Sequence, residues 1–138
     1  FRSLVGSPVK SMSCNPLRSK NAAALPTDHF SLTLNYEDGS VATLLYTAMG
    51  HRSMAKETMQ VFVDEKVFVN NDYLTMDVHG MPNASMPLKP QDKGHAKELE
   101  AFHDASVSGE RFPIPWDELK ETWEVCYKAD QLCRVGEE

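Results

Sequence analysis

Apolar and polar side chains alternate along the middle of the chain, and the alternation gives way to a helical period toward the end. Residues 30–36, 58–71 and 73–78 show the period of two that half-buried strands have. Residues 94–107 and the segment after Pro115 place apolar side chains three or four positions apart, which predicts two helices. On the second helix the predicted apolar stripe is Leu119, Trp123, Cys126 and Cys133. Strands followed by helices predict the α+β class: an open, mostly antiparallel sheet of four to six strands with helices packed on one face.

The pair Asp38-Gly39 predicts a hairpin between residues 30–36 and a second strand at 41–47. A two-residue turn would place Leu32 opposite Leu45. The second strand, VATLLYT, then offers apolar side chains to both faces of the sheet. The face without helices is expected to carry Ser31, Thr33, Asn35, Ala42, Leu44 and Tyr46, or the reverse set. Such a face suits a partner surface better than bare solvent.

Three shorter signals complete the pattern. Residues 58–71 predict a second hairpin around Asp64-Glu65, and the three prolines in residues 81–90 predict an edge strand or a loop. The opening FRSLVG has helical spacing and ends at Gly6, a residue favoured just past a helix end. It predicts the last turns of a helix whose beginning lies upstream; the alternative is a frayed terminus.

Composition narrows the function classes. The 138 residues are 41% hydrophobic and 25% charged, with a net charge of −6, which predicts one soluble globular domain over residues 1–138. The absence of a basic run argues against nucleic acid as a partner, and no apolar run reaches the roughly 20 residues that span a bilayer. The three cysteines are expected to be free thiols, since Cys126 and Cys133 would lie roughly 10 Å apart along one helix. A reducing, cytoplasmic setting fits this expectation.

Chemical motifs are scarce in this sequence. It contains no GxGxxG, no phosphate-binding P-loop, no HExxH and no GxSxG, so neither a dinucleotide cradle, nor a catalytic residue, nor a metal site is predicted. The scattered histidines do not form a metal-binding set.

Two segments are candidates for binding. In QDKGH, Lys93 and His95 lie at the start of a predicted helix, where they could hold an anionic or hydroxyl-rich ligand; the alternative is a plain helix start capped by Asp92. The loop over residues 47–57 carries His51, Arg52 and Lys56. These basic residues could reach a phosphate or a sugar, or they could simply be solvated.

Several motifs together resemble the C-terminal end of the glucose–fructose oxidoreductase/inositol dehydrogenase/MocA (Gfo/Idh/MocA) family. They are Lys93-Gly94-His95, then Glu98 and Phe102 with their spacing, then Gly109, then the run PIPWDE at residues 113–118. The stretches YEDGSVATLLYTAMG and KETMQVFVDEKVFVNND are also similar to central hairpins of that family. The chain departs from the pattern at Asp64-Glu65, where many members have a glycine-rich turn; a tight turn is harder there and a longer loop is an option.

The resemblance implies a C-terminal substrate-binding and oligomerisation domain of a two-domain enzyme, with a glyceraldehyde-3-phosphate dehydrogenase C-terminal-domain-like fold. The N-terminal Rossmann domain, the catalytic lysine and the Asp/His pair of the family would lie outside these residues. No catalytic residue is therefore assigned, and the chain alone is expected to be inactive. The parent enzyme would use NAD or NADP, which this chain alone would not bind.

The implied substrate is a sugar, a cyclitol or a related polyol, and the implied assembly is a homodimer through the open sheet face. The residues expected to face the substrate are His51, Arg52, Lys56, Lys93 and His95. The alternative from a different class is a self-standing binding or assembly module without chemistry.

Overall fold

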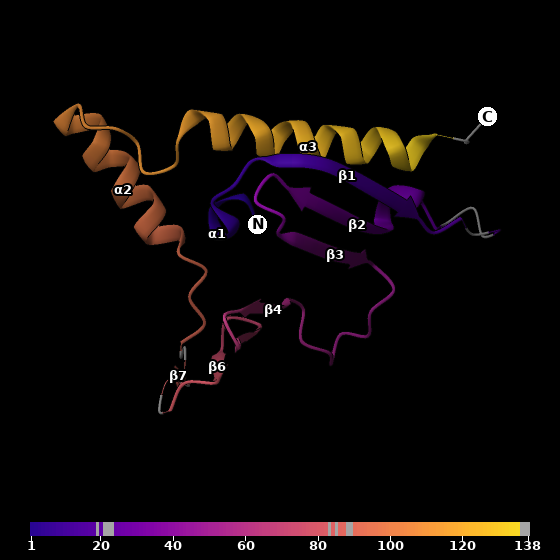
Figure 1. Cartoon of the computed structure of the whole chain (residues 1–138), viewed down its shortest axis with the longest axis horizontal. Coiled ribbons are helices and arrows are strands. Elements are labelled where there is room, and N and C mark those ends of the chain that lie inside the picture. Colours follow the sequence, from indigo (N-terminus) through magenta and orange to yellow (C-terminus); the bar gives the residue numbers. More distant parts are fainter. Residues whose placement is uncertain (19, 21–23, 83, 85, 88–89, 136–138) are drawn as a thin grey trace. The chain divides into compact units, whose positions relative to one another are not determined.

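The computed structural model describes residues 1–18, 20, 24–82, 84, 86–87 and 90–135. Its elements in chain order, shown in Figure 1, are α1 (Arg2–Val5), β1 (Val9–Pro16), the 3-10 helix η1 (Pro26–Asp28), β2 (His29–Tyr36), β3 (Val41–Thr47), β4 (Thr58–Val63), β5 (Lys66–Asn71), β6 (Thr75–His79), β7 (Met86–Pro87), α2 (His95–Ser108) and α3 (Trp116–Arg134). They form two compact units. The first unit comprises residues 1–50 and 113–138, and the second comprises residues 51–112.

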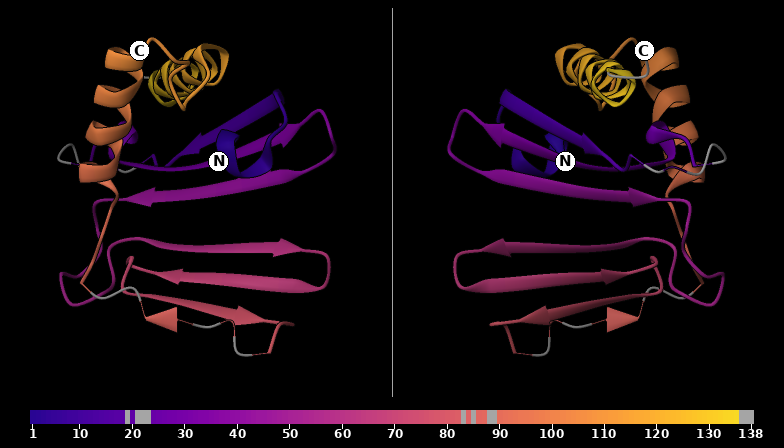
Figure 2. Two further views of the ribbon diagram at one scale, coloured as in Figure 1. Left: turned by 90° about the vertical axis from the view of Figure 1, so that its left-hand side faces the viewer. Right: turned by 90° about the vertical axis from the view of Figure 1, so that its right-hand side faces the viewer.

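The α+β class with open antiparallel sheets is confirmed. Hydrogen bonds divide the strands into a three-stranded sheet, β1-β2-β3, in the first unit and a four-stranded sheet, β4-β5-β6-β7, in the second, where the sequence predicted one sheet (Figure 2). The division follows from residues 48–57, which contain no strand and carry the chain from β3 to β4. No helix in the described part of the chain is both long and apolar enough to cross a membrane.

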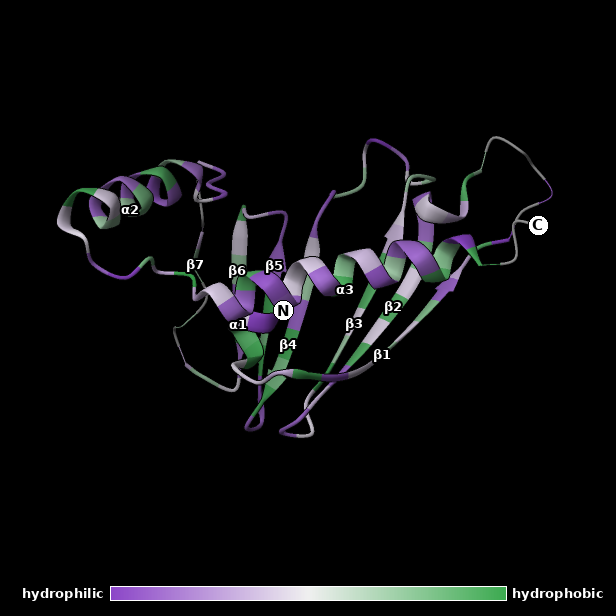
Figure 3. Cartoon of the chain, turned by 90° about the horizontal axis from the view of Figure 1, so that it is seen from above, coloured by the Kyte–Doolittle hydropathy of each residue, from purple (hydrophilic) through white to green (hydrophobic). Residues whose placement is uncertain are grey.

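The core of the first unit lies between α3 and one face of β2. Leu32, Leu34 and Tyr36 of β2 are 6%, 4% and 2% exposed, and they pack with Ala129 of α3, which is 6% exposed. Figure 3 shows the alternation of apolar and polar residues along α3 and the strands beside it. Burying each of these large side chains contributes about 1.5–3 kcal/mol, so this small cluster supplies much of the stability of the unit.

The face of α3 that packs on the sheet differs from the predicted stripe. The sequence favoured Leu119, Trp123, Cys126 and Cys133 as the apolar face. In the structure Ala129 and Cys133 are buried and Val125 is half-buried, whereas Trp123 is 71% exposed and Cys126 is exposed. The prediction was wrong for Trp123 and Cys126 because the contact follows a spacing of four residues through smaller side chains. The bulky indole is left outside.

The first hairpin turns through three residues rather than two. The Tyr36 N–H donates to the Ser40 carbonyl at 2.9 Å, and Gly39, with φ of +90°, occupies the left-handed position of the loop. Leu32 therefore pairs with Leu44, not with Leu45. The predicted register was wrong by one residue, and that shift exchanges the two faces of β3.

The corrected register changes the composition of the uncovered face. Leu44 lies on the α3 side with Leu32, and Tyr46 pairs with Phe30, with the two rings stacked at a centroid separation of 5.4 Å. The opposite face carries Ser31, Thr33, Asn35, Val41, Thr43 and Leu45. Val41 and Leu45 are 62% and 75% exposed, so the face remains partly apolar, but its apolar residues are not Leu44 and Tyr46 as predicted.

A charged network fixes α1 to α3. Arg2 Nε lies 2.6 Å from Glu121 Oε2, and Arg2 Nη1 lies 3.9 Å from Glu118 Oε1. The other oxygen of Glu121 accepts a hydrogen bond from the Val9 N–H at 2.7 Å. Burial is the largest cause that raises the pKa of the neighbouring Tyr36, and the negative charge of Glu121 adds to it.

The predicted helical turn before Gly6 is confirmed, and Gly6 ends it in the left-handed conformation.

The second unit contains two tight hairpin turns without glycine. Asp64 and Glu65 connect β4 to β5 at φ of 48° and 63°, and Asp72 and Tyr73 connect β5 to β6 at φ of 52° and 56°. The predicted hairpin at residues 58–71 is confirmed, and the longer loop considered for its turn is wrong. Aspartate tolerates the left-handed region, as at Asp64 and Asp72, whereas Glu65 and Tyr73 each store about 1–3 kcal/mol of backbone strain there.

The remaining elements of the second unit follow the sequence closely, except that β6 begins at Thr75 and not at the predicted residue 73, because residues 72–74 form the turn before it. The predicted edge strand is β7, where Pro87 pairs with Thr75 at the edge of the sheet; residues 83, 85 and 88–89 of that prediction lie outside the described residues. α2 ends at Gly109, which has φ of +72°, close to the predicted end. The predicted cap is wrong: Asp92 accepts the Gly94 N–H at 2.8 Å, while Gly94 itself is the N-cap, with φ of +80°.

Replacement of Gly80 by alanine is expected to destabilise the second unit. Gly80 has φ of +81°, and an added Cβ would lie 2.7 Å from the Glu65 carbonyl oxygen. A Gly80→Ala variant should lose about 1–3 kcal/mol of unfolding free energy in a denaturant titration. Gly50→Ala is the matched control, because its added methyl group meets nothing within 4 Å. Equal stability of the two variants would contradict this account of the turn.

Candidate functional site

The predicted binding residues fall on two segments of the second unit. His51, Arg52 and Lys56 are exposed on the segment that precedes β4. The His51 ring takes part in a local turn, with Nδ1 2.8 Å from Ser53 Oγ. Lys93 and His95 lie where the chain enters α2, and His95 is the exposed first residue of that helix.

Lys93 connects these two segments. Its ammonium nitrogen lies 2.9 Å from Glu57 Oε1. Glu57 is the residue directly after Lys56 in the sequence. The same nitrogen lies 5.5 Å from the centroid of the Tyr73 ring, within the range of a cation–π contact. The ammonium group is therefore held between a carboxylate from the start of β4 and an aromatic ring from the β5–β6 turn.

Backbone hydrogen bonds hold this arrangement in place. The Asp72 N–H donates to the Glu57 carbonyl at 2.7 Å, and the Glu57 N–H donates to Asp72 Oδ1 at 3.3 Å. The Tyr73 N–H donates to Oδ1 of Asn70, which is only 4% exposed, and Gln91 Nε2 donates to the Asp72 carbonyl at 2.6 Å. We call Glu57, Asp72, Tyr73, Gln91 and Lys93 the Lys93 cluster.

The neighbouring carboxylates favour the charged form of Lys93. The hydrogen bond to Glu57 raises the pKa of Lys93, and the carboxylate of Asp72 adds to this effect. The side chains of Lys93 and Glu57 are 32% and 43% exposed, so both remain within reach of a ligand. An ammonium group has three N–H donors and a carboxylate has several acceptor positions. One ion pair leaves both groups with capacity for the hydroxyl groups of a ligand.

The sequence identified one member of this cluster. Lys93 was among the five predicted residues; His51, Arg52, Lys56 and His95 are not part of the cluster. Glu57, Asp72, Tyr73 and Gln91 were missed. The Asn-Asp pair at residues 71–72 is a turn signal that could have located Asp72. Nothing in the pattern marks Tyr73, because its position depends on a left-handed turn without glycine.

The described residues do not fit a dinucleotide or a metal. Every described strand pair is antiparallel, whereas the pyrophosphate of a dinucleotide is held where a glycine-rich loop joins a parallel strand to a helix. In the described part of the chain, no three His, Cys, Asp or Glu side chains come together in a way that could hold a metal ion.

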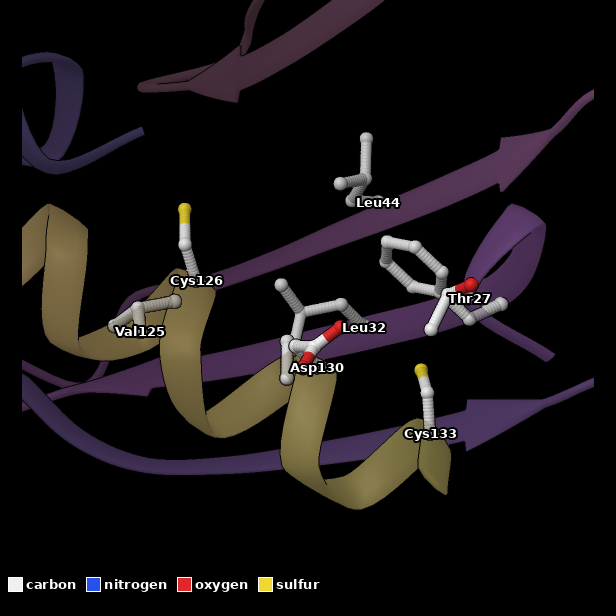
Figure 4. Close-up of a pocket in the computed structure, with 9 residues that line it drawn as sticks. Thr27, Leu32, Leu44, Val125, Cys126, Asp130 and Cys133 are labelled. Atoms are coloured by element: carbon white, nitrogen blue, oxygen red, sulfur yellow. The ribbon is translucent and has the colours of Figure 1, made fainter. Parts of the chain in front are cut away.

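The first unit contains an apolar recess of about 190 Å³ beside α3. Figure 4 shows it between α3 and the strands, with Leu32 and Leu44 on the sheet side and Val125 and Cys133 on the helix side. The recess lies on the β3 side of the core. Its lining is almost entirely apolar, so it lacks the convergent polar groups that orient a sugar.

Sequence comparison and structure comparison give different results. No protein-family model matches this chain, and no curated protein matches it. Solved structures with a similar fold include two oxidoreductases. UDP-N-acetylglucosamine 3-dehydrogenase from Acidithiobacillus ferrooxidans superposes with a TM-score of 0.68 at 16% identity, over 95% of this chain. An aldose-aldose oxidoreductase from Caulobacter crescentus, solved with glycerol, superposes with a TM-score of 0.60 at 16% identity, over 94% of this chain.

Both neighbours are oxidoreductases of the Gfo/Idh/MocA type that the sequence motifs resemble. This chain spans 43% and 41% of their respective lengths. At such low identity the likeness establishes the fold. The predicted resemblance is confirmed at that level: the chain has the fold of one part of these larger sugar oxidoreductases.

Proposed function

We propose that this chain is the substrate-side part of an NAD(P)-dependent oxidoreductase that acts on a sugar, a cyclitol or a related polyol. The observation that carries the proposal is the fold likeness, which covers almost all of this chain and less than half of two sugar oxidoreductases. The motifs around Lys93 and the PIPWDE run support the same assignment from the sequence side. This chain would bind and orient the substrate, and hydride chemistry would belong to the part that holds the cofactor.

The Lys93 cluster is the best candidate for the contact with the polyol. A charged donor and a charged acceptor 2.9 Å apart can engage two neighbouring hydroxyl groups of one ligand. His51, Arg52 and Lys56 lie on the segment that leads to Glu57, and His95 lies two positions after Lys93, so these four residues would extend the binding surface around the cluster. No residue of this chain is assigned a catalytic role.

The uncovered face of the β1-β2-β3 sheet is the proposed surface for a second copy of the chain. It presents Val41 and Leu45, which are 62% and 75% exposed, among hydroxyl and amide side chains. Isolated apolar residues are common on surfaces, but a two-fold interface uses the same patch on both copies, so this one face could pair with itself. Stable interfaces bury roughly 1,200–2,000 Å² in total.

The chain alone is expected neither to bind NADH or NADPH tightly nor to turn over a polyol. Its antiparallel sheets and its sequence offer no cradle for the pyrophosphate. Calorimetric titration with each dinucleotide should give no binding in the micromolar range. Micromolar affinity would contradict the division of labour proposed here.

Polyol binding is expected to depend on the Lys93 cluster. Chemical shifts of the chain should be followed by NMR on titration with an aldose, an inositol and UDP-N-acetylglucosamine. The shifts should concentrate at Glu57, Tyr73 and Lys93. Lys93→Ala should weaken binding roughly tenfold or more, because hydrogen bonds to charged groups are the strongest polar contacts.

Lys120→Ala is the matched control for that experiment. Lys120 also forms an ion pair with a glutamate, Glu124, at 3.7 Å on an exposed helix surface. Its loss should leave binding unchanged. Shifts that concentrate elsewhere, or equal affinity for the two variants, would rule out the cluster as the polyol site while leaving the fold-based proposal intact.

The chain is expected to dimerise through the uncovered face of its three-stranded sheet. Light scattering at micromolar concentration should give about twice the chain mass of 15.5 kDa. Leu45→Lys should give the monomer mass, because it places an unpaired charge in the interface. Val107→Lys on α2 is the control, since Val107 is similarly exposed, at 74% against 75%, and should leave the dimer intact. A wild-type monomer at all concentrations would disprove the interface.

A further inference from the structure

Two cysteines from opposite ends of the chain meet in the first unit. Cys14 Sγ of β1 and Cys133 Sγ of α3 lie 3.5 Å apart, although 119 positions separate the residues. Cys133 is 1% exposed and Cys14 is half-buried. The two sulfur atoms are in van der Waals contact, and neither is bridged.

Both thiols occupy positions that can move by the small distance a bond requires. An S–S bond is about 2.05 Å long, so the sulfur atoms must approach by about 1.5 Å. β1 is an edge strand, paired with β2 on one side. Cys133 is the next-to-last residue of α3, where the terminal turn of a helix adjusts most easily.

We propose that Cys14 and Cys133 form a reversible dithiol site that a small peroxide converts to a disulfide. One sulfur attacks the O–O bond of the peroxide and becomes a sulfenic acid, with release of one water. The second sulfur then attacks the sulfenic sulfur, the S–S bond forms and a second water leaves. The two thiols lose two electrons and two protons in total, and hydrogen peroxide is reduced to two waters.

The surroundings of the pair favour a small oxidant. Cys133 lines the apolar recess of about 190 Å³, which opens beside α3 and is large enough for hydrogen peroxide (Figure 4). Burial, together with the contact with Cys133, raises the pKa of the Cys14 thiol to about 11. Few thiolates are present at neutral pH, so attack on the peroxide should be slow and should speed up as the pH rises.

The disulfide would join the end of α3 to the edge of the sheet. It would close a loop that contains the second unit and nearly all of the chain, and long closed loops restrict the unfolded state most. Oxidation should therefore stabilise the packing of α3 on Leu32 and Leu34.

Peptide mapping of the native 138-residue chain tests the proposal. The folded chain is treated with hydrogen peroxide, the remaining thiols are alkylated after unfolding, and trypsin digestion follows without reductant. Cleavage after Lys10, Arg18, Lys120, Lys128 and Arg134 puts each cysteine on its own peptide. The expected product links residues 11–18 to residues 129–134, leaves Cys126 alkylated, melts several degrees higher and reverts with dithiothreitol.

Cys126→Ser is the matched control, because Cys126 lies on the same helix and lines the same recess. This variant should form the same linked peptide, whereas Cys14→Ser should not. A link that involves residues 121–128, or independent oxidation of Cys14 and Cys133 without a link, would overturn the proposal. Mapping of the unmodified chain decides the matter even if a variant fails to fold.

Discussion

The contact between α3 and β2 is the interaction on which the first unit depends. Three large side chains of β2, Leu32, Leu34 and Tyr36, meet the small residue Ala129, so the helix can lie close to the sheet. The contact works only with the register that the three-residue loop at Gly39 imposes, because that loop places Leu44 beside Leu32. One turn therefore determines both what is buried under α3 and what the opposite face offers to a partner.

The second unit is held together in another way. The buried apolar residues of the described chain, Leu32, Leu34, Tyr36, Ala129 and Cys133, all belong to the first unit. In the second unit, β-ladders, two left-handed turns and the buried Asn70 organise the sheet. Regions with few buried apolar contacts open at low free-energy cost. Such a region suits a binding surface that adjusts to its ligand, and the Lys93 cluster lies within it.

Under the proposed function, the two units would divide the roles of a substrate-side domain. The first unit would supply the packed helix and the sheet face for association, and the second would supply charged and aromatic groups for contact with a polyol. The fold likeness to two larger sugar oxidoreductases places this combination in a plausible enzymatic setting. In both units the described strand pairs are antiparallel, unlike the parallel strand and helix that hold a dinucleotide pyrophosphate.

The sequence by itself determined the α+β class, the extents of β2, β3 and α2 and the turn position at Asp64-Glu65, because these depend on local periodicity and turn chemistry. Only the tertiary structure decided the register of β3, the face that α3 buries and the partners of Lys93. The register depends on the length of the loop at Gly39, and the other two depend on contacts between distant residues: Glu57 and Lys93 meet 36 positions apart, and Cys14 and Cys133 meet 119 positions apart. A local pattern carries no record of such contacts, since packing selects among several faces that the pattern leaves equally apolar.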